Sequence, residues 1–262
     1  HPTHTIDVHN QAIAVGGVVG KTSGKVNLSK IVIENSNHYE IETSDSNTES
    51  LHFGGFVGFY VDSNTFTLPS GTHYSAISEV KFAGFVDILN RLNVYAGGIV
   101  GKIDATSSNL TMLVGFAQGT SGIGAEFSGH INVDKLKDSS LYLAGIVGSL
   151  TGNGTIGKTH SYGDVNIVSS SSAAKYIYAG GIIGNVSVNA SLNLDENYSL
   201  TTIHNTSATA SYANLNIKAL VGNGNYKFKG EENTNFFSSA INLATDAFST
   251  DNEKDQPKNL SY

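Results

Sequence analysis

Asp87 and Arg91 are the residues whose types and spacing come closest to a catalytic pair. They lie four positions apart in FVDILNRLNV, and Asp104 follows further along the chain. Alternate residues of a strand share one face, so the carboxylate of Asp87 and the guanidinium of Arg91 can meet there. A polysaccharide lyase uses such a base beside carboxylates that hold calcium. A structural ion pair has the same spacing, so an enzyme that degrades polysaccharides is one alternative and an ordinary ion pair is the other.

A second group of carboxylates lies around the segment 36–50, SNHYEIETSDSNTES. A glycosidase needs two converging acids, and the candidates are Glu34, Glu40, Glu42, Asp45 and Glu49. Their order does not match the ligand order of an EF-hand loop, so we expect a solvated loop. The chain has neither a GxSxG elbow nor a Ser-His-Asp signature, and the sequence predicts a protein without catalytic residues.

Nine histidines raise the question of a metal site, and they are His1, His4, His9, His38, His52, His73, His130, His160 and His204. Only His1 and His4 lie close together, and no HxxxH pattern with a glutamate occurs. We therefore expect scattered surface histidines, no metal ligands and no cofactor. Protonation of all nine would bring the net charge from −7 to about neutral or slightly positive near pH 5, so acid would favour binding to an anionic polymer.

Aromatic residues in polar segments are the candidates for ligand binding. The segment 59–75, FYVDSNTFTLPSGTHYS, is rich in them, and tyrosines on a rigid platform serve sugar or protein recognition. The predicted ligand-binding residues are Tyr60, Phe66, His73, Tyr74 and Arg91. Tyr176 and Tyr178 alternate with Ile177 and predict an outward-facing row.

Composition excludes several classes of protein. The charged fraction is 14% and the net charge is −7, with Arg91 as the single arginine, so a nucleic-acid partner is not expected. The absence of cysteine excludes disulfides and thiolate metal sites. Neither an apolar run long enough to span a membrane nor a signal peptide is present, so we expect no membrane insertion.

A glycine-rich block recurs along the chain: AVGGVVGK at 14–21, HFGGFVGF at 52–59, YAGGIVGK at 95–102, LAGIVGSL at 143–150 and YAGGIIGN at 178–185. Short segments of alternating apolar and polar residues, such as SGHINV at 128–133 and YGDVNI at 162–167, precede the blocks. The period is about 40 residues, which gives about six units. Gly20-Lys21-Thr22 resembles a phosphate loop only superficially, because a strand and not a helix follows it.

Stacked repeats of this kind predict an all-β protein, a right-handed parallel β-solenoid, over residues 1–222. At roughly 20 residues per coil, each unit would form about two coils. Residues 223–250 differ in character and predict a C-terminal cap, with a short amphipathic helix over 238–248 that buries Phe237, Ile241 and Phe248. Residues 251–262 are interpreted as a linker or tail.

The repeats resemble the GLUG motif of bacterial surface adhesins and of the N-terminal regions of large secreted proteases. The clearest match is THSYGDVNIVSSSSAAKYIYAGGIIGN at 159–185, and the resemblance covers about residues 5–222. A looser resemblance is to the β-solenoid binding regions of serine-rich repeat adhesins. These resemblances imply a location on the bacterial cell surface or outside the cell.

They also imply a non-catalytic adhesin segment that belongs to a larger surface protein. It would bind a host glycan, a mucin or an extracellular matrix protein along a rigid face. A polysaccharide lyase or hydrolase and a spacer solenoid of a secreted protease remain the alternatives.

Overall fold

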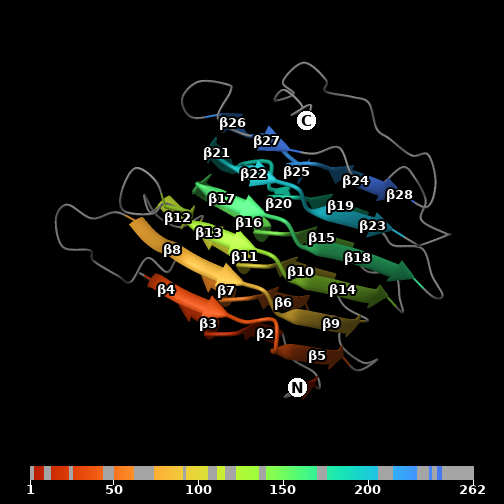
Figure 1. Ribbon diagram of the computed structural model, residues 1–262. Helices are drawn as coiled ribbons and strands as arrows, with labels where there is room; N and C mark the ends of the chain where they lie inside the picture. Colours follow the sequence, from red (N-terminus) through yellow and green to blue (C-terminus); the bar gives the residue numbers. More distant parts are fainter. Residues whose placement is uncertain are drawn as a thin grey trace.

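The computed structural model consists of β-strands stacked into long parallel sheets (Figure 1). It describes residues 3–8, 13–23, 26–43, 50–61, 74–90, 93–105, 111–115, 122–135, 140–169, 176–205, 215–228, 236–237 and 241–243. Every element within these ranges is a strand, so they contain no helix that could cross a membrane.

Two of the sheets have one strand from each repeat. Sheet A consists of β1 (Thr3–Val8), β5 (His38–Thr43), β9 (Phe85–Asn90), β14 (His130–Lys135), β18 (Asp164–Ser169), β23 (Thr202–Asn205) and β28 (Ile241–Leu243). Sheet B consists of β2 (Ile13–Gly16), β6 (Ser50–Gly54), β10 (Asn93–Gly97), β15 (Ser140–Ala144), β19 (Tyr176–Gly180) and β24 (Leu215–Lys218).

A third sheet of 15 strands has two parts, which we call sheets C and D, joined by the long strand β16 (Val147–Gly157). Sheet C contains β3 (Val19–Ser23), β7 (Val57–Val61), β11 (Val100–Ala105), the start of β16, β20 (Ile183–Val186) and β25 (Val221–Asn223). Sheet D contains β4 (Asn27–Ile33), β8 (Tyr74–Phe82), β12 (Thr111–Gly115), β13 (Ala125–Phe127), the end of β16, β17 (Thr159–Ser161), β21 (Ser191–Asp195), β22 (Tyr198–Ser199), β26 (Lys227–Phe228) and β27 (Phe236–Phe237).

The chain visits sheets A, B, C and D in turn and then returns to sheet A one strand further along. In sheet B, Leu51 pairs with Ile13 on one side and with Val94 on the other, and all strand pairs are parallel. One circuit therefore takes about 40 residues, the length of one sequence repeat. The prediction of a parallel solenoid is confirmed, and the expectation of two coils per unit is wrong.

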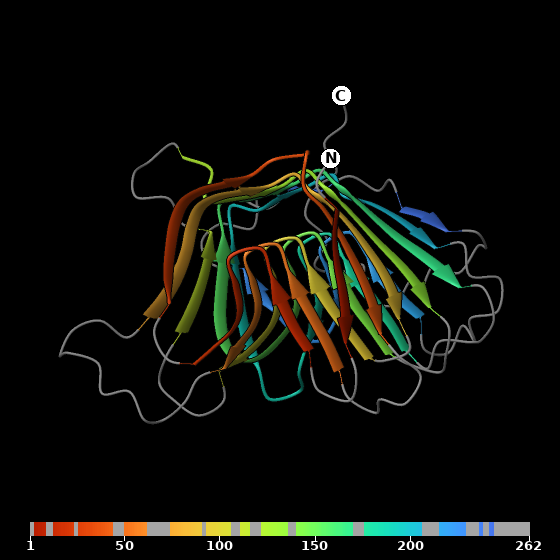
Figure 2. The ribbon, with the colours of Figure 1, turned by 90° about the horizontal axis from the view of Figure 1, so that it is seen from below.

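Seen along the stacking direction, the four sheets form two nested arches (Figure 2). Sheets D and A make the outer arch, and sheets B and C make the inner arch, with the glycine block at its bend. At Gly55 a Cβ atom would lie 2.5 Å from Cδ2 of Phe82, and at Gly98 it would overlap the ring of Phe127. The repeated glycines are thus required because the inner bend touches the outer corner, and not because they bind phosphate.

The core fills the space between the two arches. The rings of Phe82 and Phe127 are fully buried and stack at 6.3 Å between centroids and 9° between planes. Ile77 and Val80 of β8 are also buried. Residues 74–80, which belong to neither of the repeated sequence patterns, therefore supply part of sheet D and of the core.

Sheet D has an unusual backbone conformation at equivalent positions of four coils. Lys30, Glu79, Lys158 and Glu196 have φ angles of 58°, 53°, 52° and 52°, in the left-handed region that residues other than glycine rarely adopt. Lys30 lies opposite Glu79 by the register of β4 and β8, and Nζ of Lys158 lies 3.9 Å from Oε2 of Glu196. Because this conformation recurs in the stack, the strands on either side of it stay in register.

The predicted C-terminal cap lies only partly within the described residues. There, β26, β27 and β28 extend sheets D and A by pairing in parallel with β21, β22 and β23. The predicted helix over 238–248 is wrong at 241–243, where β28 is a strand. Phe248 and the tail 251–262 lie outside the described residues.

Candidate ligand-binding surface

The described structure does not bring the five residues predicted to bind ligand into one site. Tyr60 lies in the core with 1% of its surface exposed, so its predicted contact with a ligand is wrong. Tyr60 belongs to the inward-facing set of β7, while its neighbour Phe59 is half-buried. Tyr74 begins β8. Phe66, His73 and Arg91 lie outside the described residues.

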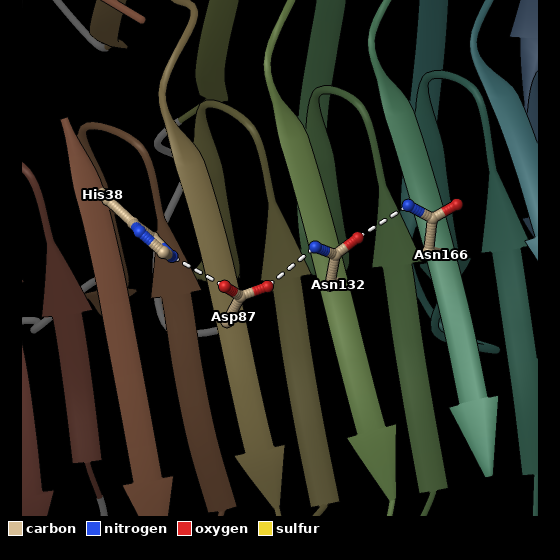
Figure 3. Close-up of polar contacts among 4 residues, drawn as sticks. All are labelled: His38, Asp87, Asn132 and Asn166. Carbon is tan, nitrogen blue, oxygen red and sulfur yellow. Dashed lines mark hydrogen bonds and ion pairs between the residues drawn. The ribbon is translucent and has the colours of Figure 1, made fainter. Parts of the chain in front are cut away.

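A polar ladder, formed by His38, Asp87, Asn132 and Asn166, runs across the outer face of sheet A (Figure 3). Nε2 of His38 lies 2.6 Å from Oδ2 of Asp87, and Nδ2 of Asn132 donates to Oδ1 of Asp87 at 2.7 Å. Nδ2 of Asn166 donates to Oδ1 of Asn132 at 2.6 Å. Four strands from four coils are therefore joined by one continuous chain of side-chain hydrogen bonds, which meets at the Asp87 carboxylate.

The ladder follows from the alternation in the short repeat segments. In FVDI, INV and VNI the apolar residues Val86, Ile131 and Val165 are fully buried, so the intervening Asp or Asn points to the outer face. The in-register pairing then places Asp87 beside Asn132 and Asn132 beside Asn166. Spacing alone did not reveal His38, which is bonded to Asp87 across 49 residues of sequence.

An aromatic row lies beside the ladder on the same face. The rings of Phe85 and His130 stack at 4.6 Å and 8°, and His38 meets Phe85 edge-on at 6.4 Å. Nδ1 of His130 lies 2.9 Å from Oδ2 of Asp164. Phe85 is 39% exposed. The surface thus offers an exposed ring next to fixed carboxylate and amide groups, which is the combination that sugar rings and their hydroxyls require.

The acidic cluster predicted to be a loop is in part a strand. Glu40 and Glu42 lie on β5 and point to the outer face of sheet A, since Ile41 between them is buried. Glu34 follows β4, and Asp45 and Glu49 lie outside the described residues. Among the residues whose side chains the structure describes, the carboxylates of this face are Glu40, Glu42, Asp87, Asp134 and Asp164.

Asp87 occupies a central position in the ladder. Both of its carboxylate oxygens are within hydrogen-bond distance of neighbours, His38 and Asn132. Among the described residues no group of three or more His, Asp or Glu side chains is arranged to hold a metal ion. The two hydrogen bonds hold the Asp87 carboxylate in one position on the outer face of sheet A.

His52 contradicts the expectation of uniformly exposed histidines. It is 5% exposed, and burial, followed by the charges of Lys102 and Lys21, lowers its pKa from 6.5 to about 3. Burial also lowers the pKa of His160. The prediction that all nine imidazoles charge near pH 5 is thus wrong for His52.

The predicted outward row of tyrosines is present on sheet B. Tyr95, Tyr142 and Tyr178, which we call the tyrosine row, lie in register on β10, β15 and β19. Tyr95 and Tyr142 stack at 4.6 Å and 13°, and Tyr142 meets Tyr178 at 5.7 Å. Tyr176 lies on the same strand as Tyr178, 5.7 Å from it between ring centroids.

Comparison with known proteins gives no match to the chain, whether among family models, curated proteins or solved structures. The resemblance to GLUG repeats accordingly stays a prediction from the sequence.

Proposed function

We propose that this chain is the non-catalytic, ligand-binding segment of a bacterial cell-surface adhesin. It would be a right-handed solenoid of about six units that binds a host glycan, a mucin or an extracellular matrix protein along one stiff face. The observation that supports this most directly is the outer face of sheet A, where Phe85 is exposed beside Asp87 and Asn132.

The polar ladder supports this function because its groups are ordered before any ligand arrives. Asp87 and Asn132 are each held by neighbours on both adjacent strands, so little side-chain freedom is lost on binding. The ring of Phe85 is fixed in the same way by stacking on His130. A pyranose ring can stack on Phe85 while its hydroxyl groups bond to the ladder.

The function is tested by binding of the whole chain to immobilised glycans, mucins and matrix proteins at pH 7.4 and pH 4.5, with analysis of each glycan for cleavage. We expect saturable binding without products. Phe85→Ala combined with Asn132→Ala should weaken binding at least tenfold, about 1.4 kcal/mol. The control Val32→Ala changes an exposed apolar residue of sheet D and should leave affinity unchanged.

Two outcomes would overturn the proposal. Absence of binding across the panel at both pH values would favour a spacer. Cleavage of a glycan that is lost with Asp87→Ala or Arg91→Ala would favour the lyase or hydrolase.

A further inference from the structure

A second surface, on sheets B and C, gathers basic and aromatic side chains that the proposed function does not use. We call it the basic–aromatic cluster: Lys21, His52, Phe59, Tyr95 and Lys102. Nζ of Lys21 lies 5.5 Å and Nζ of Lys102 lies 5.3 Å from the centroid of the Phe59 ring. Lys102 also lies 4.8 Å from the ring centroid of Tyr95. Two ammonium groups from different coils thus share one phenyl ring.

The lysines of the cluster differ from those of sheet D. Lys81 is paired with Glu126 at 2.8 Å, and Lys158 lies 3.9 Å from Glu196. Within the described ranges, neither Lys21 nor Lys102 forms an ion pair with a carboxylate.

Burial lowers the pKa of Lys102, and the opposing effect of Asp104 is the smaller one. The ammonium group is therefore partly desolvated, and its charge is incompletely balanced by the described residues. A bound anion would restore that balance.

His52 gives an independent sign that the cluster is incomplete. Its ring lies 4.4 Å from that of Phe59 and 5.1 Å from that of Tyr95. Its Nε2 atom is buried and has no hydrogen-bond partner within the part of the chain that the structure describes. Buried polar atoms are nearly always bonded in native proteins, so such an atom beside two lysines indicates a place for a polar ligand.

The distribution of charge favours an anion at this cluster and not on sheet A. The protein has a net charge of −7, and the outer face of sheet A carries several carboxylates. Lys21 and Lys102 lie on sheet C, which is part of the inner arch. An anionic ligand is repelled by the carboxylates of sheet A and attracted by the two lysines.

The tyrosine row extends the cluster along the stack of coils. Tyr95 contacts Lys102 and stacks on Tyr142, and Tyr142 meets Tyr178 in the next coil. Neighbouring strands of a sheet lie about 4.8 Å apart, so the row presents rings at a regular interval. Such a row suits a linear chain of sugar rings.

We propose that Lys21 and Lys102, whose ammonium groups lie over the rings of Phe59 and Tyr95, bind the acidic group of an anionic glycan, a carboxylate or a sulfate, and that Tyr142 and Tyr178 contact the adjoining sugars. The inference shares with the proposed function only the class of ligand, a glycan. It depends on different residues, so the two can fail separately.

The test is calorimetric titration of the whole chain with three tetrasaccharides: oligosialic acid, whose acidic groups are carboxylates, chondroitin sulfate, which carries both carboxylates and sulfates, and chitotetraose as the neutral control. We expect at least one acidic probe to bind with an affinity that falls as salt is added, and the neutral probe to bind at least tenfold more weakly.

Matched variants locate the site. Lys21→Gln with Lys102→Gln should lower affinity at least tenfold, and Tyr142→Ala should lower it severalfold. Lys81→Gln with Lys158→Gln removes the same charge from sheet D and should stay within about twofold of wild type. Lys102→Arg should keep most of the affinity, and circular dichroism at each step checks that the variants are folded.

Three results would overturn the inference: no binding of either acidic probe, unchanged affinity in the Lys21→Gln, Lys102→Gln variant, or an equal loss in the sheet D control. Loss of acidic binding with Phe85→Ala and Asn132→Ala, but not with the lysine variant, would also overturn it. That last result would move the site to sheet A and leave the proposed function intact.

Discussion

The buried ring of His52 makes stability depend on pH, and one substitution tests this. The ring contacts Phe59 and Tyr95, and Lys102 and Lys21 lie close enough to oppose its protonation. Folding therefore holds His52 in the neutral form, whereas the unfolded chain leaves it free to take up a proton.

The sign and size of the effect follow from the two pKa values. The pKa of His52 is about 3 in the folded protein, below the ordinary value of 6.5. Above pH 6.5 the ring is neutral in both the folded and the unfolded chain, so its burial lowers stability by nothing that depends on pH. As the pH falls from 6.5 toward 3, only the unfolded chain takes up a proton, and the free energy of unfolding decreases. Each pH unit within that window lowers the free energy of unfolding by about 1.4 kcal/mol. Between pH 7 and pH 4.5 the loss is about 2.5 kcal/mol, a large share of the roughly 5–15 kcal/mol typical of folded proteins.

His52→Phe removes the titrating nitrogen and keeps an aromatic ring, in register with Tyr95. Urea unfolding of wild type and variant, followed by circular dichroism from pH 7 to pH 4.5, gives the difference in unfolding free energy at each pH. We expect the unfolding free energy of the variant, relative to that of wild type, to increase by about 2.5 kcal/mol from pH 7 to pH 4.5. The other histidines are common to both proteins, so their contributions cancel.

His52→Asn separates titration from packing. It leaves a cavity and lowers stability at every pH, but its pH dependence should match that of His52→Phe. If wild type and both variants lose stability in parallel as the pH falls, the argument from burial is refuted. A wild-type His52 ring resonance that titrates near pH 6.5 in the NMR spectrum would refute it equally.

Three further substitutions test the packing and the ladder. Gly98→Ala places a methyl group against Phe127 and should destabilise by about 1–3 kcal/mol in urea unfolding, with partial recovery when Phe127→Leu is added; no loss would contradict the tight contact of the arches. Asn132→Asp places a second carboxylate where an amide now donates a hydrogen bond to Asp87. It should lower the unfolding free energy by about 1 kcal/mol or more at pH 7 and by less at pH 4. An equal effect at both pH values would count against the ladder. Burial raises the pKa of Tyr95 to about 12. Tyr95→Phe should therefore remove the last rise in an absorbance titration of the tyrosines at 295 nm. A loss of absorbance confined to the region near pH 10 would contradict the burial of this side chain. Since the unfolded chain ionises this tyrosine first, wild type should also lose stability as the pH rises above 10.

The sequence predicted the parts of the fold that depend on local alternation. Val86, Ile131 and Val165 point inward and their polar neighbours outward, as the period of two requires. The repeated glycine blocks predicted the period of the repeat, and Tyr178 predicted an outward row. These features follow from the geometry of a strand and from the stacking of equivalent positions of the repeats.

The features that the sequence did not predict depend on how strands that are distant in the sequence pack against one another. The length of a coil was wrong because β8, with buried Ile77 and Val80, belongs to neither of the repeated sequence patterns. Tyr60 and His52 were taken as exposed because burial in a nested arch depends on a second layer, which no local pattern indicates. The bond of His38 to Asp87 depends on the register between distant segments.

Each sequence repeat forms one coil, and this determines how the protein responds to a pulling force. The first coil, β1 to β4, and the last, β24 to β28, lie at opposite ends of the stack (Figure 1), and the backbone hydrogen bonds between coils run along the stacking direction. A pull between the two ends therefore loads these bonds in series, and the chain is peeled from an end one coil at a time. Register partners in sheet B lie 36 to 47 residues apart, so each released coil lengthens the tether by roughly 120 to 170 Å. A stalk built in this way would absorb tension in steps of one repeat while the coils that remain keep their surfaces intact.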